Sequence, residues 1–189
     1  MKTEFPFPDH IGSRQELIRD IHYHKIPQED ISHIADRAWD TGAAAASDIL
    51  DKYPGKSIWE VIKQEGLKVI KVDKDNVIGG MRCFSEYYLG RKTITLYLKS
   101  VKMWAAENRV SLKYGEELIL AHEFFHHLEC SVLGLTSSQY KVPRLTIGRW
   151  KIGKSGIRAL SEIGAHGFSR TFYAAGRHFD IVYNANVDE

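Results

Sequence analysis

The sequence predicts an α+β fold in which a small mixed or antiparallel sheet packs on helices and one apolar helix lies at the centre. Apolar residues recur at helical spacing in several stretches, and two segments between residues 82 and 98 have the composition of neighbouring strands. The stretch 114–133 is apolar on nearly every side. A helix without a polar face belongs in an interior, so we expect this helix to be central.

Bulk composition indicates one globular domain without a strongly charged partner. The 189 residues are 43% hydrophobic and 11% aromatic, which is enough to build one core. The 26 basic and 24 acidic residues leave a net charge of only +2. We therefore expect no direct binding to nucleic acid and none to a membrane.

Other features predict a cytoplasmic location. No run of 18 or more apolar residues is present, and the N-terminus lacks the apolar core of a signal peptide. Two cysteines, Cys83 and Cys130, are typical of a reducing compartment rather than a disulfide scaffold. Cys130 lies too far along its helix from His122 to share one ion with it, so we expect a small buried residue.

The N-terminal part of the chain predicts two helices. Residues 9–25 have a weak amphipathic pattern that ends near Pro27, and a longer helix follows over residues 27–53. A DNA-binding helix-turn-helix is the alternative. The near-neutral charge and the aromatic stripe favour packing in a core instead.

A short helix and a strand come next. Ser57 and Glu60 have the spacing of a capping box at a helix N-terminus. Gly66 is expected to end this helix before a strand over residues 67–72.

The middle of the chain predicts a strand pair. Residues 82–89 and 93–98 are expected to form a hairpin, and the second strand alternates apolar and polar side chains. If strand 93–98 borders a cleft, its free edge could pair with an extended substrate chain. The alternative is an ordinary sheet strand. A helix over residues 101–108 is expected to follow.

The most informative motif is His-Glu-Phe-Phe-His at residues 122–126, inside the apolar stretch. Two histidines four apart project from one helix face, so His122 and His126 can bind a single Zn²⁺ while Glu123 points toward a water on the metal. The alternative is a pair of hydrogen-bonded core histidines with Glu123 in an ion pair. The apolar surroundings favour the metal site, because charged groups rarely enter such a helix without a function.

A third ligand is expected from a second helix. A histidine six residues after the motif is the other common source, but that pattern fails because Glu129 and Val132 occupy its Gly and His positions. Residues 155–175 offer Glu162 on a largely apolar helix. Glu162 is therefore the predicted third ligand, and the alternative is a surface carboxylate paired with Arg158.

His166 lies one turn after Glu162 on the same predicted helix. It can be interpreted as a group that hydrogen-bonds a ligand and orients the helix. It could instead be the ligand itself.

The motif at 122–126 followed by Glu162-Ile-Gly-Ala-His-Gly-Phe-Ser169 resembles the ImmA/IrrE family of metallopeptidases. Members of that family carry HExxH and then a segment of the form E-x-x-A-N-x-F-A. The likeness covers roughly residues 30–175. It implies a zincin-like metallopeptidase domain over residues 27–175, preceded by an N-terminal helical extension at 1–26 and followed by a C-terminal tail at 176–189.

The chain departs from the family pattern at His166, where the family has Asn or Asp, and at Ser169, where it has Ala. Because of the first departure, the resemblance does not define which groups surround the metal ligands. The 35 residues between His126 and Glu162 also exceed the usual spacing, and we expect an extra loop beside the cleft.

These features lead to a mechanistic hypothesis. Zn²⁺ is held by His122, His126 and Glu162, and Glu123 acts as the general base. An oxyanion-stabilising group is also expected. Besides His166, the candidates are Tyr173, Arg170, Tyr140 and His127.

The resemblance implies a protein or peptide substrate, because relatives include proteases that cut repressor-type regulators. One alternative is a catalytically silent zinc-binding module that regulates by docking a partner, although the intact Glu123 argues against it. Another alternative is a non-peptide amidohydrolase, which would need a closed pocket in place of an open groove with a strand edge.

Overall fold

The computed structural model describes residues 5–175 and confirms the α+β class. The predicted tail at 176–189 lies outside the described residues. The helices are α1 (Gln15–Arg19), α2 (Asp30–Lys52), α3 (Ile58–Gln64), α4 (Leu98–Glu107), α5 (Leu112–Leu128) and α6 (Ala159–Ala175). The strands are β1 (Lys68–Val72), β2 (Asn76–Ile78), β3 (Met81–Cys83), β4 (Ser85–Tyr88), β5 (Thr93–Tyr97), β6 (Lys141–Ile147) and β7 (Trp150–Gly156).

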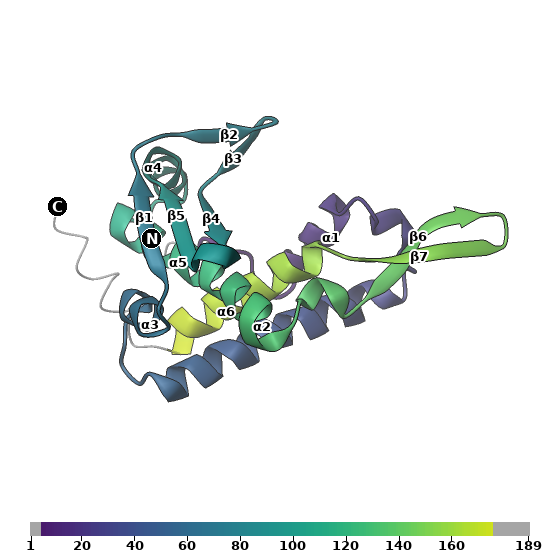
Figure 1. The fold of residues 1–189 in the computed structure, drawn as a ribbon, viewed down its shortest axis with the longest axis horizontal. Coiled ribbons are helices and arrows are strands. Elements are labelled where there is room, and N and C mark those ends of the chain that lie inside the picture. The colour runs from purple at the N-terminus through teal and green to yellow at the C-terminus, as the bar shows by residue number, and fades with distance from the viewer. Residues whose placement is uncertain (1–4, 176–189) are drawn as a thin grey trace.

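The main sheet is mixed, with the strand order β1-β5-β4 (Figure 1). Strand β5 is parallel to β1 and antiparallel to β4, so the predicted strand pair is confirmed. Its first strand is shorter than the predicted 82–89, because β3 pairs with β2 in a separate sheet and only β4 pairs with β5. Of the two alternatives for strand 93–98, the structure has the ordinary sheet strand and not the free edge, because β1 and β4 pair with β5 on both sides. Alternating residues indicate a strand but not its neighbours, and the strands at the two edges of the sheet are β1 and β4.

Helix α5 is central, as predicted. It contacts α3, α4, α6 and strands β4 and β5, and its interior side chains belong to one large core cluster. The capping box of α3 is also present, with Glu60 N donating to Ser57 Oγ and Ser57 N donating to Glu60 Oε2. Phe124, Phe125, Phe168, Phe172 and Tyr173 are among the largest side chains buried in the core.

The single helix expected over residues 9–25 is wrong. The structure has only α1 there, between two 3₁₀ turns at Gly12–Arg14 and Tyr23–Lys25. The backbone leaves helical geometry at Asp20, which has φ −72° and ψ 134°. The carboxylate of Asp20 accepts a hydrogen bond from Ala159 N at 3.0 Å, so it caps the N-terminus of α6.

Three further expectations are corrected. Helix α5 ends at Leu128 and continues as a π-helical turn over Glu129–Leu133, which leaves Cys130 exposed rather than buried. Helix α4 begins at Leu98 rather than Val101. Helix α6 begins only at Ala159, because residues 150–156 belong to β7.

The extra segment before α6 is a β-hairpin that the sequence analysis did not predict. Strands β6 and β7 pair as a two-stranded antiparallel sheet that extends away from the body of the protein (Figure 1). Its side chains do not line the cavity described below, so the expected loop beside the cleft is instead a ribbon.

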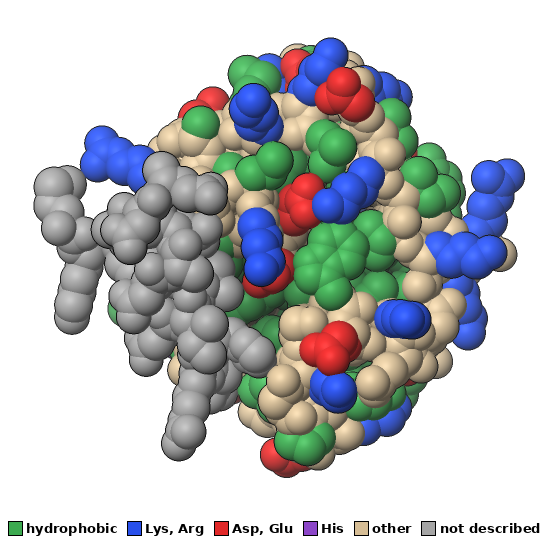
Figure 2. Space-filling model, turned by 90° about the vertical axis from the view of Figure 1, so that its left-hand side faces the viewer, with side chains coloured by type: hydrophobic (Ala, Val, Ile, Leu, Met, Phe, Trp, Pro, Cys, Tyr) green, Lys and Arg blue, Asp and Glu red, His purple; other side chains and the backbone are tan. Residues whose placement is uncertain are grey.

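The surface shown in Figure 2 carries basic and acidic side chains interspersed among apolar ones, so neither sign gathers on this face. Among the described residues, none of the helices has the length and hydropathy needed to span a lipid bilayer.

Helices α2 and α6 pack backbone against backbone. A Cβ atom built on Gly42 would lie 1.8 Å from the carbonyl oxygen of Gly164, and one built on Gly167 would lie 2.6 Å from the carbonyl oxygen of Trp39. Main-chain atoms cannot rotate aside as side chains do. The two helices can therefore approach this closely only because glycine occupies both positions.

We expect Gly42→Ala to lower the free energy of unfolding by about 3 kcal/mol, the upper end of the usual cost of overpacking a core. Alanine favours a helix over glycine by about 1 kcal/mol, which is too little to offset the clash. Urea denaturation followed by circular dichroism measures the change. Ser47→Ala, on the exposed face of the same helix, is the control and should change stability by less than about 0.5 kcal/mol. Equal stability of the two variants would contradict the close packing.

Candidate metal centre

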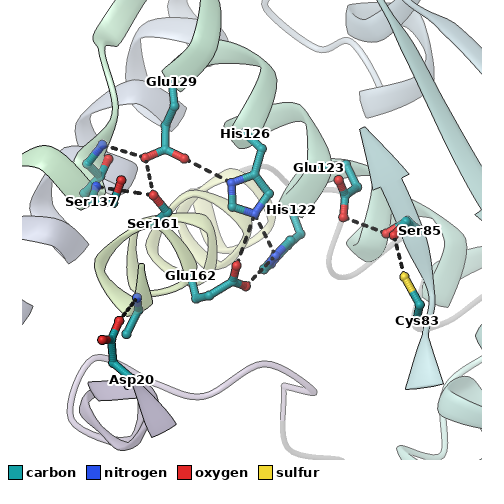
Figure 3. A network of polar contacts seen from close by, with 12 residues as sticks. Asp20, Cys83, Ser85, His122, Glu123, His126, Glu129, Ser137, Ser161 and Glu162 are labelled. Carbon is teal, nitrogen blue, oxygen red and sulfur yellow. Dashed lines mark hydrogen bonds and ion pairs between the residues drawn. The ribbon is translucent and has the colours of Figure 1, made fainter. Parts of the chain in front are cut away.

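Two histidines from α5 and one carboxylate from α6 converge (Figure 3). The N-terminus of α5 is capped by Ser111, whose Oγ accepts from Tyr114 N. One turn separates His122 from His126, and their Nε2 atoms are 3.2 Å apart. Glu162 Oε2 lies 3.2 Å from His122 Nε2, and Oε1 lies 3.7 Å from His126 Nε2.

The three side chains fit a divalent cation. One donor atom from each lies within 4.8 Å of the others. In a tetrahedral site with bonds of 2.0–2.1 Å, neighbouring ligand atoms are about 3.3 Å apart. The observed separations of 3.2, 3.2 and 3.7 Å are close to that value. The structure therefore brings together His122, His126 and Glu162 in a geometry that suits metal binding.

A buried carboxylate supports one of the histidines. Glu129 Oε2 lies 3.0 Å from His126 Nδ1, and Glu129 is only 3% exposed. Its other oxygen accepts hydrogen bonds from Thr136 N at 2.7 Å and Ser161 Oγ at 2.9 Å (Figure 3). A carboxylate in this position fixes the tautomer and the ring orientation of a metal-binding histidine.

Sequence reasoning missed this role of Glu129. The available signal was an acidic residue three positions after His126 in an otherwise apolar helix. Such spacing places the two side chains on adjacent parts of one helix face.

The carboxylates make the site favourable for positive charge. Burial lowers the pKa of His126, but the hydrogen bond to Glu129 and the charges of Glu123 and Glu162 outweigh it and raise the pKa to about 9. Burial raises the pKa of Glu162, but the hydrogen bond to His122 and the neighbouring histidines lower it to about 2. The site stabilises either a proton on His126 or a bound cation.

Glu123 points away from the three converging groups, toward strand β4 (Figure 3). Ser85 Oγ donates a hydrogen bond to Glu123 Oε1 at 2.7 Å. The carbonyl of Ser85 accepts from Cys83 Sγ at 3.1 Å. Glu123 is thus held in a fixed orientation beside the metal-binding group without being part of it.

A cavity of about 610 Å³ opens onto these residues. His122, Glu123 and Glu162 all line it. The other walls come from the N-terminal residues, from the residues around strands β3 and β4, and from helices α4, α5 and α6, which contribute Trp104, Ile119 and His166. Residues Cys83, Phe84 and Ser85 line it from the strands, and Phe7, Pro8, Gly12, Gln15, Glu16 and Arg19 line it from the N-terminal segment.

Of the other predicted site residues, His166 also lines the cavity. Its ring centroid lies 5.5 Å from that of His122, and it is 7% exposed. Burial, followed by the charge of His122, lowers the pKa of His166 to about 3, so the ring is neutral. Its Nδ1 atom has no hydrogen-bond partner among the described residues.

The remaining candidates lie away from the cavity. His127 Nδ1 contacts Tyr87 Oη at 2.8 Å, and Tyr140 Oη donates to Asp30 Oδ2 at 2.6 Å. Tyr173 is 2% exposed and packs edge-on against Tyr114 in the core.

Arg170 is likewise absent from the cavity lining, and its guanidinium donates to the carbonyl oxygen of Phe7 at 3.1 Å. The structure therefore does not bring Tyr173, Arg170, Tyr140 or His127 to the reacting centre. Helical spacing alone could not distinguish the face toward the cavity from the others.

Comparison with known proteins finds no matching family model, no similar curated protein and no similar solved structure. The site is thus defined by the geometry of its own residues. Its most specific element is the approach of Glu162 to both histidines, since those residues are more than 30 positions apart in the chain.

Replacing Glu129 tests its support of the metal ligand. We expect Glu129→Gln to weaken Zn²⁺ binding 10- to 100-fold, as is usual when the partner of a metal-binding histidine is lost. Competition with a chromophoric chelator measures the affinity. Glu117→Gln is the matched control, because Glu117 is also a buried glutamate but lies more than two helical turns before His126 on α5. If both variants lose Zn²⁺ affinity to a similar extent, Glu129 acts only through the general stability of the fold.

The raised pKa of His126 predicts a pH-dependent affinity. A metal needs the unprotonated ring, so below about pH 9 binding must release a proton, and the affinity for Zn²⁺ should rise about tenfold per pH unit between pH 7 and 9. In the metal-free protein the same proton stabilises the fold. That contribution is complete below the unfolded pKa of about 6.5 and is lost as the pH rises through 9.

Calorimetric titration in two buffers of different ionisation enthalpy counts the released protons. Glu129→Gln should flatten the pH dependence, because the hydrogen bond that raises the pKa of His126 is weakened. An affinity that stays constant between pH 7 and 9 would show that His126 is already unprotonated.

Proposed function

We propose that the chain is a zinc-dependent metallopeptidase of the ImmA/IrrE type, with a zincin-like domain, that hydrolyses peptide bonds in a regulatory protein of the cytoplasm. The observation that carries this proposal is the position of Glu162, whose two oxygens lie 3.2 and 3.7 Å from the Nε2 atoms of the HExxH histidines. Two imidazoles and one carboxylate are the donor set of many zinc hydrolases.

The chemistry divides between the ion and the protein. Bound by His122, His126 and Glu162, Zn²⁺ would lower the pKa of water and polarise a carbonyl group. Glu123 accepts the proton of the attacking water and then donates it to the leaving amine. Ser85 holds the carboxylate of Glu123 at the wall of the cavity through the hydrogen bond at 2.7 Å.

The edge strand supports a peptide substrate. Strand β4 pairs only with β5 within the sheet, and its residue Ser85 lines the cavity. The free edge of β4 presents main-chain groups that can pair with an extended chain, whatever its sequence. An open cavity beside a strand edge favours a peptide over the small closed pocket of a non-peptide amidohydrolase.

The base assignment is tested by Glu123→Gln. We expect zinc stoichiometry to be unchanged and the turnover number to fall by at least about 10²-fold, the lower end of the usual contribution of a general base. Digestion of a defined peptide library, followed by mass spectrometry of the products, measures turnover, and metal analysis measures zinc. Glu117→Gln is the control and should keep both.

Glu162→Ala separates the metal role from the catalytic role, since it should lose zinc as well as turnover. Full zinc occupancy in Glu162→Ala would reject Glu162 as a ligand. A wild-type protein that binds zinc but leaves every peptide intact would support the silent docking module instead.

A further inference from the structure

The N-terminal segment Phe5–Pro8 lies against the metal-binding group. The ring of Phe7 is 5.5 Å from the ring of His122, a proposed metal ligand, and 5.3 Å from that of His166. On its other side it lies 5.4 Å from the Trp104 ring. An aromatic side chain of the chain itself therefore occupies part of the space next to the reacting centre.

This segment packs along the site, with Phe5 and Phe7 both against the main core cluster. The guanidinium of Arg170 donates to the carbonyl of Phe7 at 3.1 Å and lies 5.0 Å from the centroid of the Phe5 ring. Pro6 and Pro8 have no N–H to donate, and their rings fix the backbone angle φ. The segment thus enters the site in a stiff conformation, and its contacts include the guanidinium of Arg170 and the rings around Phe7.

The residues that follow are fixed more firmly. Gly12 N donates to Asp9 Oδ1 at 2.7 Å, and Arg14 forms an ion pair with Asp36 of α2 at 2.7 Å. Leu17 is fully buried in a core cluster with residues of α2 and α6. The segment Phe5–Pro8 can therefore leave the site while the chain from Asp9 onward stays in place.

The groups that surround Phe7 form an apolar recess at the cavity wall. Trp104 and Ile119 line the cavity together with His166. A flat, largely apolar recess beside the metal-binding group suits the side chain next to the scissile bond of a peptide.

We propose that Trp104, Ile119 and His166 form a subsite for an aromatic side chain of the substrate, and that Phe7 is its internal occupant, which a substrate must displace. This inference rests on the proposed peptidase function and adds a substrate preference and an intramolecular competitor. A tethered segment competes at an effective concentration on the order of millimolar. Weak contacts are therefore enough to reduce the apparent affinity for a peptide.

The test uses the full chain with Glu123→Gln, so that a bound peptide is not cleaved. The probe is a fluorescein-labelled octapeptide with the sequence of residues 2–9, Lys-Thr-Glu-Phe-Pro-Phe-Pro-Asp, and fluorescence anisotropy gives its dissociation constant. Phe7→Ala should bind this peptide about tenfold more tightly than its parent, because the competitor is removed. A peptide with Ala in place of the second Phe should not gain affinity.

Two further variants separate competition from a general effect. Arg170→Gln keeps Phe7 but removes its anchor, and it should also increase the affinity for the peptide. Ile11→Ala is the control, because Ile11 belongs to the same N-terminal segment but is 70% exposed, and it should leave the affinity unchanged.

Equal or weaker binding in both Phe7→Ala and Arg170→Gln would overturn the proposal, since Phe7 would then be a fixed wall of the site. Zinc content is measured for each protein. Loss of zinc or of hydrolysis in the wild-type chain would count against the peptidase function, whereas the comparison of peptide affinities would still decide the role of Phe7.

Discussion

The close contact between α2 and α6 determines the geometry of the candidate site. Gly164 lies where three helices meet, because a Cβ atom there would be 2.7 Å from the ring of Phe125 on α5 and 3.3 Å from the carbonyl of Ala38 on α2. Glu162 is only two residues away. The packing of α6 against α2 and α5 therefore determines the separation between the Glu162 carboxylate and the histidines of α5. This packing leaves no space for a methyl group at Gly42 or Gly164.

A second constraint is the buried carboxylate of Glu129. It joins three parts of the chain, since it contacts His126 on α5, the backbone of Thr136 in the following turn, and Ser161 on α6. A buried charge is tolerated only when its lone pairs are satisfied, so these contacts hold one another in place. The ring orientation of His126 thus depends on the turn that leads into the β6–β7 hairpin.

Local patterns in the sequence predicted helices α2 to α6, strands β1, β4 and β5, and the HExxH group, because helical spacing places His122 and His126 on one face whatever surrounds them. They could not predict contacts that depend on the rest of the fold. Asp20 interrupts an amphipathic stretch in order to bond Ala159, which is 139 residues away. The neighbours of β5 and the partners of Glu129 are likewise non-local, and periodicity carries no information about them.

The histidine at position 166 has a physical explanation in this arrangement. The ImmA/IrrE family, which the motifs resemble, has Asn or Asp at the corresponding position, and neither side chain presents a flat ring. In this chain the ring of His166 stacks on Phe7 with an interplanar angle of 29°, and it is neutral, so the stacking carries no cost of burying a charge. The ring also contacts His122. His166 therefore connects the N-terminal segment to the metal-binding group, a role for which Asn or Asp could not substitute.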